Sequence, residues 1–317
     1  SAGVRVGACG PASCFPAAEA EPTPVRISKV QAMDVFIARW LALWQREITG
    51  GEKNFFRARP PPCSLDGMKA VILAAGKGTR MKELTQELPK PMLRVQGKPI
   101  LEHILLGLIS AGVHEVFVVT GWKAEVIEDH FGDGSKWGVR ISYGRQLVQD
   151  GTGKAPELAK NFIGTSSFIL TYGDILVRPE TYQQMVHRFQ EGYYSGVITV
   201  TPGEDVTKGG LNFFDEQFCL KRLVEKPSPA QIEELQRTGW LKPGTPAWYN
   251  AGIYIFKPSL FEFTAKLAKS PRGEYELTDA ISALIATKHT LAGLEIQGRW
   301  VDVRDPEVLA ALENSGP

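Results

Sequence analysis

From Met68 onward, short apolar runs rich in β-branched residues alternate with stretches whose apolar residues recur at helical spacing. The run AVIL at residues 70–73 is followed by PILEHILLGLISAG at 99–112, whose apolar side chains share one helical face before Gly112. Further strand-like runs are EVFVVT, VRISY and SFILTY, and the helical patterns between them are KAEVIEDHF and PELAKNF. Strands separated by helices pair in parallel, so this alternation predicts an α/β fold with a doubly wound, mostly parallel sheet.

The second half, from about Gly196, contains more strand-like sequence together with the helical patterns PAQIEELQRTG and YELTDAISALIATK. It contains no internal repeat. We therefore expect residues 68–317 to form one domain, which is within the size range of large α/β domains.

Residues 1–67 have a different character and are expected to be an N-terminal extension. Their ends are rich in Ala and Pro, and between them MDVFIARWLALWQREI has apolar residues at helical spacing, which is compatible with one helix near residues 33–47. That stretch is too short and too interrupted by charge to cross a bilayer. We favour a packing helix or a poorly ordered segment over a docking or membrane-surface helix. Met68 precedes a buried-strand run, so translation starting there is a further expectation.

Composition limits the classes of partner. A net charge of +1 provides no sequence-wide basic field, so neither a nucleic acid nor a membrane is expected as partner. The four cysteines form no CxxC pair, which favours reduced thiols and a cytoplasmic location. The five histidines are scattered and match no metal-binding spacing. Oligomeric state stays open, and a homo-oligomer is compatible with the sequence.

The stretch VILAAGKGTRM at residues 71–81 is a candidate phosphate-binding turn. It matches neither GxGxxG nor GxxxxGK[ST], the two common phosphate-binding patterns. Its glycines nevertheless allow backbone N–H groups to approach an anion, and Arg80 adds donors suited to phosphate oxygens. The alternative is an ordinary tight turn, which would not need the arginine.

Five more charged residues lie where they could serve the same site. Lys90 stands between two prolines that restrict the backbone, although alone it reads as an exposed loop lysine. Asp174 and Asp302 each follow an apolar strand, and two such carboxylates with substrate phosphates could hold Mg²⁺, or each could be a helix cap. Glu225 pairs a carboxylate acceptor with the cation of Lys226, which suits a sugar phosphate but is also common in surface ion pairs.

Taken together, LAAGKGTRMKELTQELPKPML resembles the signature of the sugar-1-phosphate nucleotidyltransferases, the pyrophosphorylases that make nucleotide sugars. The resemblance recurs in family order at QLVQDGTGKA, YGDILV, VEKPS, YNAGIYIF and WVDVRDPE, and it covers residues 68–317. It is nearest to the short glucose-1-phosphate thymidylyl- and uridylyltransferases. It implies a Rossmann-like nucleotidyltransferase fold, similar to the GT-A fold.

The resemblance also implies roles for individual residues. Catalysis would fall to Arg80, Lys90 and Lys226, and the metal Mg²⁺ to Asp174 and Asp302. Sugar binding would fall to Glu225, Asn250 and Gly252. Nucleotide binding would fall to Ala74, Ala75, Gly76, Gly78, Thr79, Gln146, Gly151 and Thr152.

The implied reaction joins an NTP to a hexose 1-phosphate, giving an NDP-sugar and pyrophosphate. The attacking phosphate oxygen is already anionic, so no general base is required and catalysis is mostly positioning and charge neutralisation. The amide of Gln146 can match the carbonyl and N–H of a uracil or thymine edge, which favours UTP or dTTP.

Some features and alternatives stay open. Arg304-Asp305 stands where the family usually has glycine and threonine, and Lys154 replaces a small or imidazole side chain. A mannose-1-phosphate guanylyltransferase or a phosphocholine cytidylyltransferase would share the turn and differ at Gln146. A non-catalytic nucleotide-sugar-binding relative would be expected to lack the metal aspartates or Arg80, and a Rossmann oxidoreductase is disfavoured by the missing GxGxxG.

Overall fold

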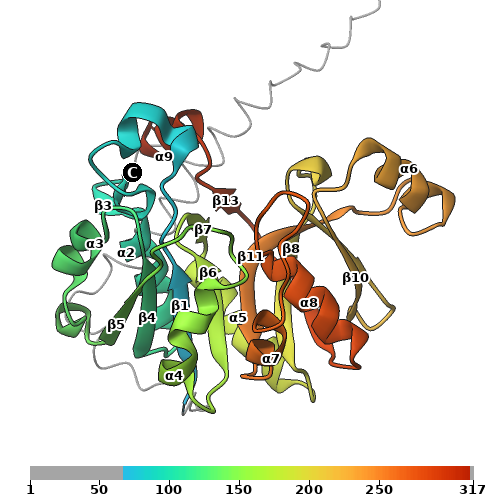
Figure 1. The fold of residues 1–317 in the computed structure, drawn as a ribbon, viewed down its shortest axis with the longest axis horizontal. Helices are drawn as coiled ribbons and strands as arrows, with labels where there is room; N and C mark the ends of the chain where they lie inside the picture. Colours follow the sequence, from blue (N-terminus) through green and yellow to red (C-terminus); the bar gives the residue numbers. More distant parts are fainter. Residues whose placement is uncertain (1–66, 315–317) are drawn as a thin grey trace, which may run out of the picture.

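The computed structural model describes residues 67–314, which are built around one nine-stranded sheet (Figure 1). The strand order is β10-β9-β11-β6-β1-β4-β5, with β8 paired to β11 and β12 paired to β8. The helix expected near residues 33–47 lies outside the described residues. No helix within residues 67–314 combines the length and apolarity needed to cross a membrane.

The first half of the chain forms the parallel part of the sheet, as predicted. β1 pairs in parallel with both β4 and β6, and β4 pairs in parallel with β5. The bounds of these strands are β1 (Lys69–Leu73), β4 (Glu115–Thr120), β5 (Arg140–Arg145) and β6 (Phe168–Tyr172). The helices between them are α2 (Ile100–Ser110), α3 (Ala124–Phe131), the 3-10 helix η5 (Ala155–Ala159) and α4 (Lys160–Ile163).

The second half extends the sheet with mixed strand directions. Its central strand β11 (Trp248–Phe256) is antiparallel to β6, β8 and β9, whereas β12 is parallel to β8. The remaining strands are β8 (Gly196–Thr201), β9 (Gly210–Phe214), β10 (Leu220–Glu225) and β12 (Leu291–Glu295). The helices of this half are α5 (Pro179–Gln190), α6 (Pro229–Arg237), α7 (Leu260–Thr264) and α8 (Leu277–Ala286).

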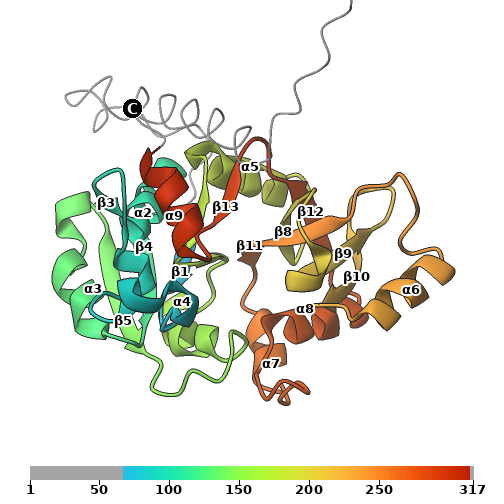
Figure 2. The same ribbon diagram turned by 90° about the horizontal axis from the view of Figure 1, so that it is seen from above.

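Helices cover both faces of the sheet, because alternate residues of each strand point to opposite sides. Ile72 of β1 belongs to a buried cluster with residues of α2 and α5, whereas its neighbour Val71 belongs to a second cluster with residues of α7 and α8. Figure 2 shows α2 and α5 on one side of the sheet and α7 and α8 on the other. The predicted doubly wound α/β class is therefore confirmed.

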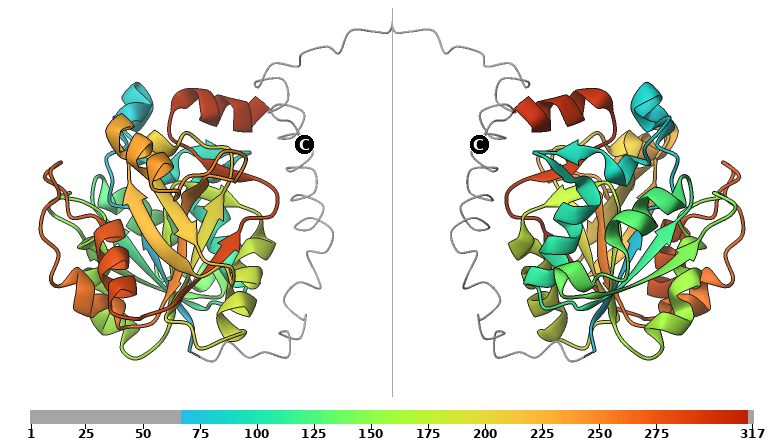
Figure 3. Two further views of the ribbon diagram at one scale, coloured as in Figure 1. Left: turned by 90° about the vertical axis from the view of Figure 1, so that its right-hand side faces the viewer. Right: turned by 90° about the vertical axis from the view of Figure 1, so that its left-hand side faces the viewer.

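Two short ribbons and a last helix complete the structure. β7 (Ile175–Val177) pairs antiparallel with β13 (Trp300–Asp302), and β2 (Arg94–Val95) pairs with β3 (Lys98–Pro99). The chain then enters α9 (Pro306–Asn314). Figure 3 shows α9 and the segment that follows β1 at the same end of the molecule.

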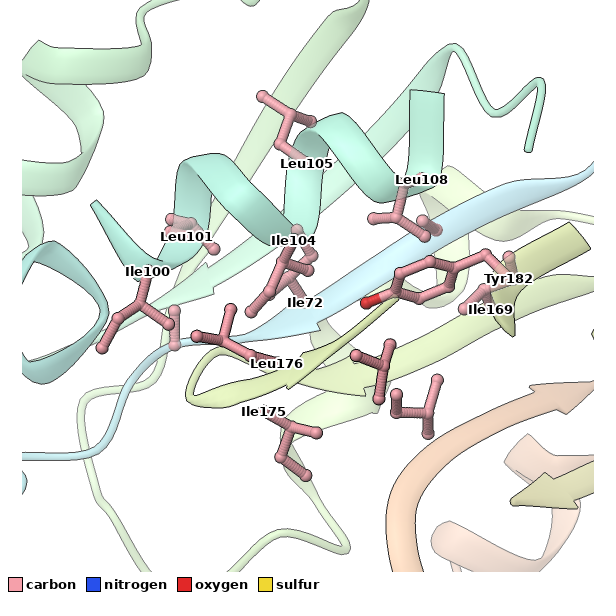
Figure 4. Close-up of a cluster of buried hydrophobic side chains, with 14 of the residues drawn as sticks. Ile72, Ile100, Leu101, Ile104, Leu105, Leu108, Ile169, Ile175, Leu176 and Tyr182 are labelled. Carbon is pink, nitrogen blue, oxygen red and sulfur yellow. The ribbon is translucent and has the colours of Figure 1, made fainter. Parts of the chain in front are cut away.

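The contact between α2 and α5 is unusually close at one position. Figure 4 shows Tyr182 beside Ile104 and Leu108 in the cluster that covers β1. The ring of Tyr182 lies against Gly107, where an added Cβ would be 2.6 Å from Cε2 of the tyrosine. Glycine therefore lets α2 approach α5, and both helices pack over the strands whose ends carry the functional residues.

We predict that Gly107→Ala destabilises the protein. Alanine in a helix interior ordinarily stabilises by about 0.5–1 kcal/mol relative to glycine, but here its methyl group would overlap the fully buried Tyr182 ring. The expected net loss is about 1–3 kcal/mol in the free energy of unfolding, measured by urea denaturation. Gln236→Ala, at an exposed position of α6, should change it by less than about 0.5 kcal/mol. A stability equal to or above wild type for Gly107→Ala would contradict the packing described.

Candidate active site

A cavity of about 500 Å³ opens at the carboxyl ends of β1 and β6. In open α/β sheets this edge is where ligands bind. Every site residue predicted from the sequence lines it, namely Ala74, Ala75, Gly76, Gly78, Thr79, Arg80, Lys90, Gln146, Gly151, Thr152, Asp174, Glu225, Lys226, Asn250, Gly252 and Asp302. The structure therefore brings all of them together, whatever the role of each.

The glycine turn connects β1 to a 3-10 helix, η2 (Thr79–Thr85). Gly78 has φ of +66°, in the left-handed region that L side chains rarely adopt, and an added Cβ would lie 2.9 Å from Cβ of Lys90. Its carbonyl accepts a hydrogen bond of 3.0 Å from the hydroxyl of Thr85. Both backbone conformation and space therefore require glycine, and Arg80 follows two residues later at the cavity wall.

Lys90 lies beside two carboxylates from distant parts of the chain. Its Nζ is 2.5 Å from Oδ2 of Asp174 and 3.8 Å from Oδ1 of Asp302, and the lysine as a whole is buried. The two aspartates are neighbours because β7 pairs with β13, which puts Asp302 opposite Ile175. The amide of Val303 also donates a hydrogen bond of 3.0 Å to the carbonyl of Asp174.

Burial is the main influence on the charge of Asp302. The pKa of Asp302 is raised to about 6, mainly by burial and next by the neighbouring Asp174, against the opposing effects of Lys90, Arg304 and Arg80. Within residues 67–314 no group of three His, Cys, Asp or Glu side chains forms a ready-made metal site. A cation between these two aspartates would therefore need further oxygen ligands from water or substrate.

Glu225 ends β10 at the opposite side of the cavity, and Lys226 follows it. Lys226 has φ of +42°, a strained conformation for a lysine, and its amide donates a hydrogen bond of 3.0 Å to the carbonyl of Gly209. Burial is the main cause that raises the pKa of Glu225, while Lys226 and Arg272 act in the opposite direction. Strain of this kind at a cavity wall is typical of functional positions.

Asn250 and Gly252 lie at an irregular part of β11. The pairing of β11 with β8 shifts register between Asn250 and Tyr254, and Oδ1 of Asn250 accepts hydrogen bonds from the amide of Gly252 and the hydroxyl of Tyr254. Gly252 has φ of +77°, and an added Cβ would overlap Ile175 and the ring of Tyr172. Such irregularities re-aim side chains, and here Asn250 is turned toward the cavity.

The loop around Gln146 is fixed at both ends. The Gln146 amide donates to the carbonyl of Thr120 at 2.8 Å, and its Nε2 donates to the carbonyl of Gly151 at 3.3 Å. Tyr275 then donates its amide to Asp150 and accepts from the amide of Gly153, each at 2.7 Å. The segment before α8 therefore holds the loop that carries Gln146, Gly151 and Thr152.

Sequence reasoning did not assign several residues that line the same cavity. Tyr249 and Trp300 make an edge-to-face contact with centroids 5.6 Å apart, and burial raises the pKa of Tyr249 to about 12. Both lie in sequence next to predicted site residues, Asn250 and Asp302, and this proximity could have identified them. Glu276 lies near no predicted site residue in the sequence. The unassigned residues include Tyr172, Tyr249, Glu276, Trp300 and Arg304.

Comparison with known proteins identifies relatives for nearly all of the described chain. The family model "Nucleotidyl transferase" matches residues 69–314. The low-salt glycan biosynthesis nucleotidyltransferase Agl11 of Haloferax volcanii is 32% identical over 76% of this chain and 63% of the relative. The UTP–glucose-1-phosphate uridylyltransferase AglF of the same organism is 32% identical over 76% of this chain and 93% of the relative.

Solved structures agree on the fold. A UDP-glucose pyrophosphorylase complexed with UDP-glucose superposes with a TM-score of 0.67 at 24% identity, covering 78% of this chain and 97% of that one. The chain spans about half to two thirds of the length of the first curated relatives it matches.

We predict that Asp302→Asn stabilises the metal-free protein more at pH 8 than at pH 5. The folded-state pKa of about 6 lies above that of an unfolded Asp, so the folded protein loses stability as the pH rises from about 4 to 6. Asparagine removes that cost, which is about 2–3 kcal/mol. The melting temperature measured in chelator should rise by about 5 °C at pH 8. Asp129→Asn, at an exposed position of α3, is the control. Equal effects of Asp302→Asn on the melting temperature at both pH values would contradict the raised pKa of Asp302.

Proposed function

Because the chain belongs to the nucleotidyl transferase family, we propose that it transfers the nucleoside monophosphate of UTP or dTTP to a hexose 1-phosphate, releasing pyrophosphate. The observation that carries the proposal is the convergence of three cations and two adjacent carboxylates in one cavity beside a glycine turn. The cations are those of Arg80, Lys90 and Lys226. This combination suits two phosphate-bearing substrates.

The cavity is equipped for positioning rather than for proton transfer. None of its lining residues within the described chain is a histidine or cysteine. A sugar 1-phosphate needs no general base, since its phosphate oxygen is anionic at neutral pH. In the proposed mechanism Arg80 and the amides of Gly76–Thr79 bind the triphosphate, and Lys226 binds the attacking phosphate. Lys90 neutralises the negative charge that develops between the triphosphate and the attacking phosphate.

The residues present fit Mg²⁺. Two carboxylates held together by the β7–β13 pairing offer hard oxygen ligands for the ion. We propose that Asp174 and Asp302 hold the ion. It would supply positive charge to the phosphates when bound.

Two observations support a pyrimidine nucleotide and a glucose-like sugar. Gln146 lies at the cavity wall, and its amide offers both a donor and an acceptor to a uracil or thymine edge. AglF, named a UTP–glucose-1-phosphate uridylyltransferase, is similar over 93% of its length. Glu225, Asn250 and Gly252 lie at the opposite side of the cavity, and we assign them to the sugar.

Pyrophosphate release across a grid of NTPs and sugar 1-phosphates tests the proposal. We expect Mg²⁺-dependent turnover with UTP or dTTP and glucose 1-phosphate, and loss of turnover in chelator. Lys226→Gln should lower kcat/KM about a hundredfold or more, because it removes a preorganised charge. Lys242→Gln, an exposed loop lysine, should not.

Other outcomes would point elsewhere. Turnover with GTP and mannose 1-phosphate but not with UTP or dTTP would overturn the choice of base. Turnover with CTP and phosphocholine would indicate a cytidylyltransferase. No turnover with any pair, with Asp174→Asn binding nucleotide as wild type does, would favour a non-catalytic nucleotide-sugar-binding relative.

A variant of Gln146 tests the assignment of the base. Gln146→Glu replaces the amide donor by a second acceptor, so kcat/KM for UTP should fall by about tenfold or more relative to GTP. Gln149→Glu adds the same charge to the same loop and is the matched control. If both variants lower activity with UTP and GTP equally, added charge alone explains the loss and Gln146 does not read the base.

A further inference from the structure

Arg304 is a cavity-lining cation with no part in the mechanism above. It follows β13, and its Nη2 lies 2.9 Å from Oε2 of Glu204, in the loop after β8. Its Nε lies 3.8 Å from Oδ2 of Asp302, and the guanidinium sits above the ring of Trp300. The group is therefore held between two carboxylates at the cavity wall.

The guanidinium of Arg272 lies beside Glu225 and has a similar environment. The Arg304–Glu204 pair lies near Glu225 as well, because the charges of all three residues affect the pKa of Tyr249, the residue before Asn250. Nη2 of Arg272 lies 2.7 Å from Oε1 of Glu276 and 3.5 Å from Oε1 of Glu225. The Glu276 side chain is only 8% exposed, whereas that of Arg272 is 36% exposed. Each of the two guanidinium groups is therefore already matched by two carboxylates.

These ion pairs determine how the proposed sugar-binding end of the cavity would interact with a charged sugar ring. Lys226 is the remaining cation there, and it also lies 3.8 Å from Glu225. The carboxylates of Glu204, Glu225 and Glu276 thus face these three cations. Four of the six residues line the cavity itself, namely Arg304, Lys226, Glu225 and Glu276. A ring hydroxyl can donate to a carboxylate and accept from a guanidinium N–H, whereas a ring carboxylate would meet cations that are already paired.

Resting on the proposed function, we propose that the Arg304–Glu204 pair is a specificity-determining element that restricts the reaction to hexose 1-phosphates whose ring is uncharged. A ring bearing a carboxylate must compete with Glu204 for Arg304. An uncharged ring leaves the pair intact and hydrogen-bonds to its edge. The pair thus acts on sugar choice and is separate from the cations assigned to the phosphates.

Opposite charge changes at the two positions test this. The measured quantity is kcat/KM for glucuronic acid 1-phosphate divided by that for glucose 1-phosphate, at pH 7.5. Glu204→Gln leaves Arg304 without its 2.9 Å partner and should raise the ratio about fivefold. Arg304→Gln leaves Glu204 uncompensated and should lower the ratio by about the same factor. The double variant restores the net charge and should return toward wild type.

The ratio separates specificity from structural damage. A substitution that acts through Asp302 or through folding should change kcat/KM for both substrates by the same factor, so its effect cancels in the ratio. Glu234→Gln and Arg237→Gln, which break an exposed ion pair of 2.6 Å on α6, are the matched controls and should leave the ratio unchanged. If both Glu204→Gln and Arg304→Gln reduce the two activities equally, the pair is structural and the proposal is wrong.

A binding measurement keeps this test independent of catalysis. Titration calorimetry with the same two sugar 1-phosphates, in the presence of UTP and Ca²⁺, gives a ratio of dissociation constants for each variant. Absent turnover in the wild type would count against the proposed function. Shifts of opposite sign in the binding ratio would still support the role of the pair, and equal affinities in all variants would overturn it.

Discussion

The pairing of β7 with β13 is the contact on which the site depends. It joins the segment after β6 to the last strand of the chain and makes Asp174 and Asp302 neighbours. Lys90 then fits beside both carboxylates, in a position that Gly78 leaves free. The same ribbon leads into Arg304, so one short pairing positions both the carboxylates that could hold a cation and the Arg304–Glu204 pair that we propose acts on the sugar.

The first half of the fold could be predicted because its signals are local. Each parallel strand is a short buried run next to an amphipathic helix, and the observed strands agree with those runs. The lining residues from this half follow strand ends, where the topology of an α/β sheet brings ligands. The sequence also predicted a glycine turn at this point. The structure gives the reason at Gly78, where the left-handed backbone and the nearby Lys90 both exclude a side chain.

The rest could not be predicted because it depends on non-local pairing. The mixed directions around β11 are set by contacts with three other strands, none adjacent to it in sequence. Arg304 was recognisable only as an unusual residue, because its partner Glu204 lies on a loop from another part of the chain. Glu276 is a surface-like residue in the sequence and is buried only because the segment before α8 closes over the loop of Gln146.

The distribution of charge in the cavity matches the difference between the two ligands that we propose for it. Phosphates carry full charges. The groups assigned to them include Arg80 and the backbone amides of the glycine turn, which can donate hydrogen bonds to an anion. A hexose ring offers only hydroxyls, and at the end of the cavity that we assign to it the guanidinium groups of Arg272 and Arg304 are already paired with carboxylates. Paired charges present donors and acceptors without a net attraction for either sign. A site divided in this way would bind a sugar 1-phosphate by its phosphate and select it by its ring.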